Sequence, residues 1–135
     1  MNQRGKIVAE KILLIDKDTE LLNQIKPDLE SAGFEIITAS SAKQGLDKIR
    51  VEQPDFIVVE LMLEKHDSGF ELVKTVKADP VCKKTKVLML SSAKEKTGVE
   101  FSQQEDGFWM KTDDFINKPV SSESLIKKIK QMVKN

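Results

Sequence analysis

Five short apolar runs alternate along the chain with longer stretches in which apolar residues recur at helical spacing. The run at 56–59, Phe-Ile-Val-Val, has no polar position, which is typical of a strand buried on both faces. Strands that alternate with helices of these lengths predict an α/β fold, a doubly wound five-stranded parallel sheet with helices on both faces. The five runs lie at 12–15, 35–39, 56–59, 86–90 and 114–117.

Capping residues mark where the predicted helices begin. Ser41 with Gln44, and Ser68 with Glu71, have the spacing of a capping box, in which the serine accepts from a first-turn amide and the second residue reaches back. Pro27 falls inside the first helical stretch, where it removes one backbone hydrogen bond, so we expect that helix to bend.

The stretch from 92 to 112 has no helical period throughout, and it contains two glycines. We therefore expect a short or displaced helix there. The same stretch concentrates Phe101, Phe108 and Trp109 among polar residues. These rings are interpreted as a partner surface, because Trp and Phe are favoured interface anchors, and the alternative is that they cover the core.

Composition narrows the class of protein. A chain of 135 residues suits one domain, which we place at 11–135 after a loose leader at 1–10. Its 22 basic and 22 acidic residues cancel, so no overall field favours nucleic acid or a membrane. The single cysteine, Cys82, and the lack of a secretory signal or a long apolar stretch predict a reduced, cytoplasmic protein.

Four segments carry a resemblance to a known family. They are Ile-Leu-Leu-Ile-Asp at 12–16, Pro-Asp-Phe-Ile-Val-Val-Glu-Leu-Met-Leu at 54–63, Lys-Val-Leu-Met-Leu-Ser at 86–91 and Phe-Ile-Asn-Lys-Pro at 115–119. With their order and spacing, the chain resembles the receiver domain of bacterial two-component response regulators from about residue 11 to 133. The resemblance implies a flavodoxin-like strand order, which brings Asp16, Glu60, Ser91 and Lys118 to one edge of the sheet.

The resemblance also implies a role for each position at that edge. Glu60 stands at the position of the phospho-accepting aspartate, and Lys118 matches the lysine that pairs with the phosphoryl group. Ser91 and Phe115 match the hydroxyl and aromatic switch residues. Asp16 matches the first of two acids that hold a divalent cation.

Two departures from the family change the expected chemistry. Lys17 replaces the second acid, and an ammonium beside the site disfavours Mg²⁺, which prefers octahedral oxygen ligands. We therefore expect no metal cofactor, with Asp16 and Glu60 as weak candidate ligands. Asp18 is a substitute ligand or, as we favour, a helix N-cap.

Glu60 is one methylene longer than aspartate, and a misplacement of about 1 Å can cost on the order of a hundredfold in rate. We therefore expect no phosphoryl transfer to Glu60. Two interpretations stay open. The longer side chain brings negative charge near Lys118 and Ser91 and imitates the phosphorylated form, or it forms an ion pair with Lys118 or Lys17 and carries no signal.

The loop after residue 63 also departs from the family. Glu64 stands where a proline is expected, and one extra residue precedes Gly69, so we expect the loop to hold its neighbours less rigidly. His66 is a single histidine in a charged loop, and we interpret it as solvated rather than as a metal or phosphotransfer site.

The final helix, capped by Ser121 or Ser122, is amphipathic. Its lysines are interpreted as a solvated face that suits a helix C-terminus, with a basic docking surface as the alternative. Receivers commonly dock or dimerise through this region, so a homodimer stays open, and we expect the partner on residues 94–112 with the face of this helix. The lysines are Lys127, Lys128, Lys130 and Lys134.

We interpret the chain as a stand-alone, atypical receiver domain that works as a protein interaction module without aspartyl phosphorylation and is not an enzyme. The expected partner is a histidine kinase, a phosphotransfer protein or an output protein. One alternative is a metal-dependent phosphoacceptor that uses Glu60 or Asp67. Another is a small-ligand-binding flavodoxin-like domain, which the lack of a glycine-rich loop after the first strand disfavours.

Overall fold

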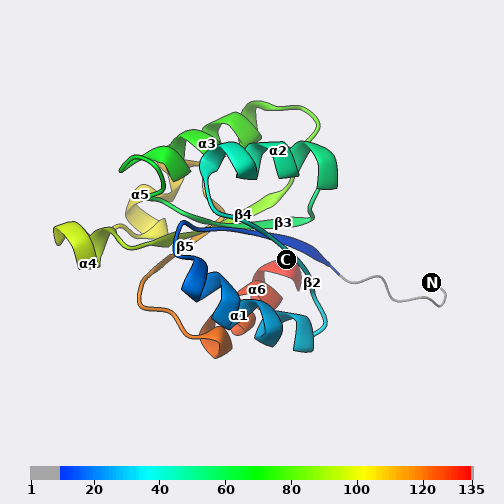
Figure 1. The fold of residues 1–135 in the computed structure, drawn as a ribbon. Helices are drawn as coiled ribbons and strands as arrows, with labels where there is room; N and C mark the ends of the chain where they lie inside the picture. Colours follow the sequence, from blue (N-terminus) through cyan, green and yellow to red (C-terminus); the bar gives the residue numbers. More distant parts are fainter. Residues whose placement is uncertain (1–9, 135) are drawn as a thin grey trace.

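The computed structural model describes residues 10–134, apart from the side chain of Phe108, so the predicted leader at 1–10 lies outside it except for Glu10. Five strands form one parallel sheet in the order β2-β1-β3-β4-β5 (Figure 1). The predicted α/β fold with a flavodoxin-like strand order is confirmed. The strands are β1 (Lys11–Ile15), β2 (Glu35–Ala39), β3 (Phe56–Glu60), β4 (Lys86–Ser91) and β5 (Asp114–Asn117).

Helices cover both faces of the sheet (Figure 1). Alternate side chains of β1 point to opposite faces, so Leu13 and Ile15 pack in one core while Ile12 and Leu14 pack in the other. The first core is covered by α2, α3 and α5, and the second by α1 and α6. The helices are α1 (Thr19–Ser31), α2 (Ala42–Glu52), α3 (Ser68–Ala78), α4 (Ala93–Thr97), α5 (Gln103–Met110) and α6 (Ser122–Lys134).

The start of α2 follows the predicted capping box only in part. Ser41 Oγ accepts from the backbone N–H of Gln44 at 3.1 Å, as predicted. The Gln44 side chain reaches one residue further back than the motif requires, and its Oε1 accepts from the N–H of Ser40 at 2.9 Å. The α1 helix continues through Pro27.

The capping box predicted at Ser68 and Glu71 is wrong. Ser68 is the first residue of α3, and Asp67 takes the N-cap position without a side-chain cap hydrogen bond. The Ser68 hydroxyl accepts instead from the N–H of Lys65 at 2.8 Å. The loop before α3 therefore uses the serine that the sequence pattern assigned to the helix.

The stretch from 92 to 112 forms two short helices. Gly98, with a φ of 80°, ends α4, and Ser102 Oγ begins α5 by accepting from the N–H of Glu105 at 3.1 Å. A side-chain pair then closes α5, because Gln103 Nε2 donates to the carbonyl of Thr112 and Gln103 Oε1 accepts from its hydroxyl, both at 2.8 Å. The expected short helix is therefore present as α4.

No helix within residues 10–134 combines the length and the apolar character that crossing a membrane requires.

Candidate functional site

Four polar side chains lie where strands end at one edge of the sheet. Asp16 follows β1, Glu60 and Ser91 close β3 and β4, and Lys118 follows β5. Because β1, β3 and β4 are adjacent and parallel, their carboxyl ends meet at the same edge, which is where open α/β sheets place ligands. The predicted convergence rests on this strand order.

Lys118 bridges the two carboxylates of this edge. Its Nζ lies 2.7 Å from Asp16 Oδ2 and 3.0 Å from Glu60 Oε1. The three side chains are nearly inaccessible, with 10%, 4% and 1% of the Lys118, Asp16 and Glu60 side chains exposed. The predicted ion pair between Lys118 and Glu60 is therefore present, and the alternative pairing of Glu60 with the exposed Lys17 is not needed.

Backbone amides hold the other oxygen of Glu60. Its Oε2 accepts from the N–H of Met62 at 2.8 Å and from the N–H of Ser92 at 3.2 Å. Oε1 contacts Lys118 Nζ without an aligned hydrogen bond. One carboxylate thus joins the ends of β3 and β4 to the residue after β5, an arrangement that no sequence pattern indicated, because backbone donors are present at almost every position.

Burial and pairing act in opposite directions on the charges of this cluster. Burial raises the pKa of Asp16, and the hydrogen bonds from Lys118 and from the backbone of Asp18 only partly oppose it. For Lys118, burial lowers the pKa, but the hydrogen bond to Asp16 and the charges of Asp16 and Glu60 outweigh burial and raise it. Lys118 therefore carries its charge at neutral pH, as the bridge requires.

Asp18 has the role of a helix cap. Its Oδ1 accepts from the N–H of Leu21 at 3.1 Å, and its own N–H donates to Asp16 Oδ1 at 2.9 Å. The favoured interpretation of Asp18 as an N-cap is confirmed. The bond from the Asp18 N–H also fixes the orientation of the Asp16 carboxylate.

Ser91 and Phe115, the two predicted switch positions, are both buried. Ser91 Oγ accepts from the N–H of Ala93 at 3.1 Å, so the hydroxyl caps the turn into α4. The Phe115 ring lies 6.1 Å from the ring of Phe101, centroid to centroid, within the core under α5. Both residues connect the edge of the sheet to the 92–112 stretch.

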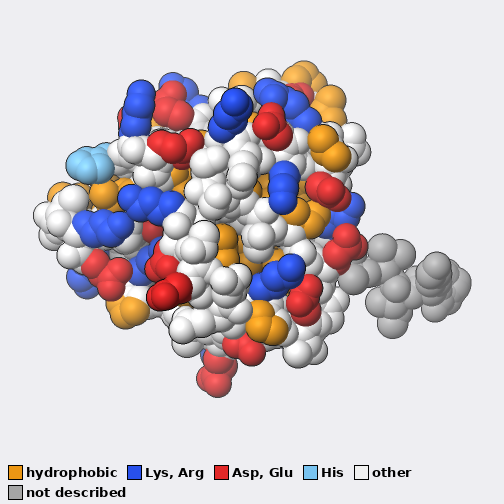
Figure 2. All heavy atoms as spheres, viewed as in Figure 1, with side chains coloured by type: hydrophobic (Ala, Val, Ile, Leu, Met, Phe, Trp, Pro, Cys, Tyr) orange, Lys and Arg blue, Asp and Glu red, His pale blue; other side chains and the backbone are white. Residues whose placement is uncertain are grey.

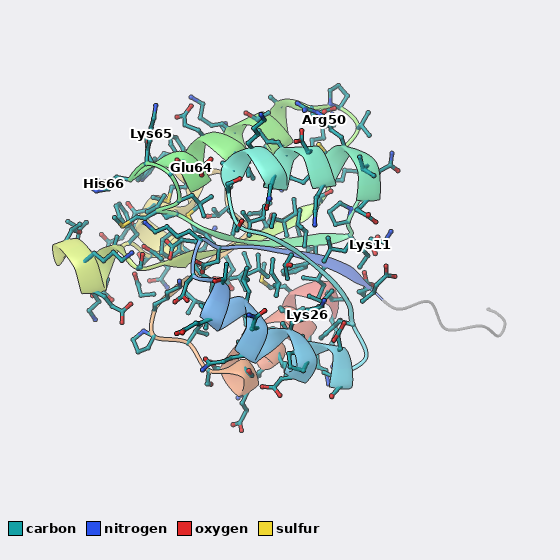
Figure 3. The ribbon with its side chains drawn as sticks, in the orientation of Figure 1. Lys11, Lys26, Arg50, Glu64, Lys65 and His66 are labelled. Carbon is teal, nitrogen blue, oxygen red and sulfur yellow. The ribbon has the colours of Figure 1, made fainter. Side chains whose placement is uncertain are left out.

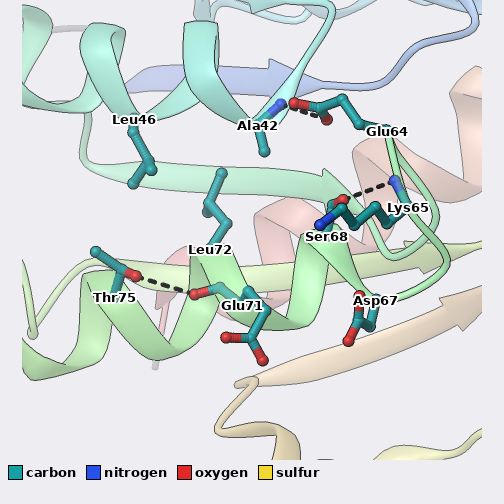
Figure 4. A pocket seen from close by; sticks show the side chains of 9 residues that line it. All are labelled: Ala42, Leu46, Glu64, Lys65, Asp67, Ser68, Glu71, Leu72 and Thr75. Atoms are coloured by element: carbon teal, nitrogen blue, oxygen red, sulfur yellow. Dashed lines mark hydrogen bonds between the residues drawn. The ribbon is translucent and has the colours of Figure 1, made fainter.

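The loop after β3 is held at several points, one of them at Glu64, while its lower rigidity relative to the family stays a prediction. Glu64 Oε1 accepts from the N–H of Ala42 at 2.9 Å, which ties the loop to the first residue of α2 (Figure 4). Burial raises the pKa of Glu64, but backbone N–H groups of Ala42, Glu64 and Lys43 outweigh it, so the pKa is lowered. Sequence reasoning missed this contact, although the acid and the start of α2 were both identified.

The beginning of α3 packs directly on the backbone at Glu60. Gly69 donates its N–H to the carbonyl of Leu61 at 2.8 Å. A Cβ at this glycine would lie 2.2 Å from the Glu60 carbonyl oxygen, so no larger residue fits without a shift. His66, in the same loop, is exposed, as predicted, and is labelled at the upper left of Figure 3.

A hollow of about 480 Å³ lies between α2 and α3 beside this loop (Figure 4). Leu46 and Leu72 contribute apolar side chains, and Glu64, Asp67 and Glu71 contribute carboxylates. Glu64 is engaged by Ala42, and Glu71 lies 3.8 Å from Lys74. Asp67, the alternative phosphoacceptor, lies in this exposed loop rather than in the buried cluster.

The predicted partner surface is only partly exposed. Trp109 is 45% exposed and packs edge-on against Phe70 and Phe101, with centroid distances of 5.3 and 6.2 Å. Its Nε1 donates to Asp106 Oδ1 at 3.0 Å. Phe101 is half-buried against the core, and the side chain of Phe108 lies outside the described part of the structure.

The acidic oxygens at this edge are already in contact with a cation, the Lys118 ammonium. Lys118 occupies the space between the two carboxylates, and the part of the chain that the structure describes contains no group of three or more His, Cys, Asp or Glu side chains placed to hold a metal ion. Magnesium requires several oxygen ligands at close to octahedral positions.

Comparison with known proteins decides the family. The sequence model of the family described as response regulator receiver domain matches residues 12–130 of this chain. This chain is a response regulator receiver domain. The receiver is similar to two solved structures, a putative response regulator from Chloroflexus aurantiacus (26% identity, TM-score 0.81, covering 95% of this chain and 100% of that one) and a CheY-like receiver domain protein from Methanospirillum hungatei (26%, 0.80, 94% and 95%).

Curated relatives are longer than the receiver. The alkaline phosphatase synthesis transcriptional regulatory protein PhoP of Bacillus subtilis is 30% identical over 125 residues, which cover 93% of this chain and 49% of PhoP. The heme response regulator HssR of Staphylococcus saprophyticus is 32% identical over 122 residues, covering 90% of this chain and 50% of HssR. The chain thus spans about half the length of these relatives and corresponds to a receiver of two-component systems.

Proposed function

We propose that this receiver works as a protein interaction module of a two-component system, with Glu60 held in a permanent ion pair and without aspartyl phosphorylation. The partner would be a histidine kinase, a phosphotransfer protein or an output protein. The observation that carries the proposal is the bridge from Lys118 to both Asp16 and Glu60, at 2.7 and 3.0 Å.

The bridge supports the proposal because it uses the groups that phosphoryl transfer needs. A cation in such a transfer neutralises the charge that moves onto the acceptor, and it must contact acidic oxygens to do so. Here the Lys118 ammonium already contacts both carboxylates, and both oxygens of Glu60 lie against neighbouring groups. Neither an incoming phosphoryl group nor magnesium reaches Glu60 without displacing these contacts.

The part of the module that meets the partner is proposed around Trp109 on α5. The indole is half exposed and rests on Phe70 and Phe101, so a rigid aromatic face is presented without the cost of ordering it. Tryptophan is among the residues that most often dominate interface energies. Through Phe101 and Phe115 this surface connects to the core beside the Lys118 cluster.

Acetyl phosphate with magnesium, read by intact mass, tests the proposal. We expect no added phosphoryl group on the wild type, and a gain of one in the double variant Lys17→Asp, Glu60→Asp, which restores the second acid and the shorter acceptor. Calorimetry should show tighter magnesium binding in Lys17→Asp than in the wild type, since one cation is exchanged for an oxygen ligand. A wild-type phosphoryl gain that is lost in Glu60→Gln would refute the proposal in favour of a phosphoacceptor.

A further inference from the structure

A second exposed apolar surface lies where the strands begin, at the end of the sheet opposite to Glu60. Among the described residues, four large hydrophobic side chains are exposed, and Val51 and Val81 are the most exposed, at 79% and 80%. Val51 is in the last turn of α2, and Val81 is in the loop between α3 and β4. Hydrophobic side chains gather over these two segments at the upper right of Figure 2. Isolated exposed valines are ordinary, but a gathered group marks an interaction surface.

The surface is hollowed as well as apolar. A cavity of about 380 Å³ is lined by Ile49, Pro54, Val81 and Cys82, which are apolar, and by four polar or charged residues, Arg50, Gln53, Asp79 and Thr85. It lies where the C-terminal end of α2 faces the loop after α3, and Cys82 is half-buried in it. Val81 therefore projects from the surface at the rim of a hollow, an arrangement in which the side chain of one molecule can fill the hollow of another.

The rim of this hollow carries one charge of each sign. Arg50, labelled at the top of Figure 3, forms a long, exposed ion pair with Asp47 at 3.9 Å, a kind of pair that contributes little. Asp79 accepts from the N–H of Val81 at 2.9 Å through one oxygen, Oδ1. Both side chains line the hollow.

We propose that two copies of this chain associate through this surface around a two-fold axis. In such an isologous contact residue i of one copy meets residue j of the other and the reverse, so a surface with one cation and one anion beside an apolar centre is complementary to itself. Arg50 of each copy would face Asp79 of the other, with Val81 of each entering the facing hollow. The formal net charge of zero leaves no overall repulsion between copies.

This proposal is independent of the function proposed above, because the two surfaces lie at opposite edges of the sheet. Sedimentation equilibrium from about 1 µM to about 1 mM should show a reversible monomer–dimer equilibrium. We expect Val81→Asp to raise the dissociation constant by about tenfold or more, since it places a charge in the apolar centre. Asn23→Asp is the control, because Asn23 is exposed on α1, which packs on the opposite face of the sheet from α2, and the added charge there should leave the equilibrium unchanged.

A charge-exchange experiment tests the two-fold geometry itself. Arg50→Asp alone makes an aspartate face Asp79 of the other copy, and Asp79→Arg alone makes an arginine face Arg50 of the other copy. Like charges then repel, so each variant should be mostly monomeric where the wild type is dimeric. Mixed in equal amounts, the two variants restore both opposite-charge pairs and should form a heterodimer. Circular dichroism confirms that each is folded. A monomeric wild type up to about 1 mM, a dimer that resists Val81→Asp, or a mixture that stays monomeric would each overturn the proposal.

Cys82 offers a readout that does not depend on molecular mass. It is the single cysteine of the chain, and it lines the hollow that the second copy would cover. Its alkylation rate per molecule should therefore fall as the wild-type concentration rises and stay constant in Val81→Asp. A rate that is independent of concentration in the wild type contradicts a dimer through this surface. A small molecule or an unrelated protein as the true occupant would give that same result.

Discussion

Removing Lys118 is the most informative perturbation of the buried cluster. Lys118→Met keeps an unbranched apolar stem but deletes the ammonium that lies 2.7 Å from Asp16 and 3.0 Å from Glu60. Both carboxylates then stay buried, and Glu60 keeps only the amides of Met62 and Ser92. The variant therefore tests whether the bridge holds this edge of the sheet together.

The expected loss is large because the partners cannot reach water. Breaking a buried ion pair by removing one member typically costs about 3–5 kcal/mol, a large part of the roughly 5–15 kcal/mol that stabilises a domain. The matched control is Lys128→Met. Lys128 lies 2.9 Å from Asp114, but 30% and 26% of these side chains are exposed. Such a pair contributes about 1 kcal/mol or less, so the control should lose little.

Urea unfolding followed by circular dichroism measures both variants, and pH adds a second criterion. Burial already raises the pKa of Asp16, and without Lys118 the main opposing contact is gone. An acid whose pKa is raised on folding destabilises the folded state increasingly as the pH rises from the pKa of the unfolded chain, 3.8, through the pKa of the folded state. The deficit of Lys118→Met should thus be greater at pH 7 than at pH 5. A loss no larger than that of Lys128→Met, or a deficit that does not depend on pH, would refute this reasoning.

Three further changes address the loop after β3 and the aromatic surface. Gly69→Ala places a Cβ 2.2 Å from the carbonyl oxygen of Glu60, which is backbone and cannot move aside, so urea unfolding should show a loss of at least about 1–3 kcal/mol. In Glu64→Gln the lost stability should be evident at pH 7 and should decrease as the pH falls from 4.5 through the lowered pKa of folded Glu64, because that shift stabilises the fold only while the acid is ionised; equal differences in melting temperature at pH 2 and pH 7 would contradict this. Trp109→Ala should cost only about 1 kcal/mol, since the ring is half exposed, yet weaken partner capture; a large fall in melting temperature with unchanged capture would show that the ring serves the core.

The strands were predictable because their signal is strong and local. An unbroken apolar run such as 56–59 suits only a strand covered on both faces, and the predicted β2 and β5 agree with the observed Glu35–Ala39 and Asp114–Asn117. Once the strand order is known, the end of each strand places its polar residue at the shared edge. The Lys118–Glu60 pair follows from that placement and from the cost of an unpaired buried carboxylate.

The predictions failed where one acceptor has several possible donors, or where the partner lies far away along the chain. Ser68 satisfies the loop amide of Lys65 rather than the first turn of α3, and no sequence pattern distinguishes these outcomes. Glu64 finds its partner, the amide of Ala42, across 22 residues of sequence. The 92–112 stretch is closed by the pair of Gln103 and Thr112, nine residues apart, so its two short helices carry little periodic signal of their own.

The contacts of Glu60 bear on whether its charge imitates an active state. That interpretation places the negative charge of the carboxylate near both Lys118 and Ser91. The Lys118 contact is present, but Ser91 Oγ accepts from the N–H of Ala93, and Glu60 Oε2 takes the N–H of Ser92 instead. The Glu60 carboxylate thus contacts backbone amides just after β3 and β4, and the Ser91 hydroxyl keeps its bond in the turn into α4. This arrangement favours a structural ion pair over a phosphoryl mimic. The Glu60 carboxylate already accepts hydrogen bonds from fixed amides, so a bond to the Ser91 hydroxyl would gain little, and Ser91 would lose its bond from the Ala93 amide.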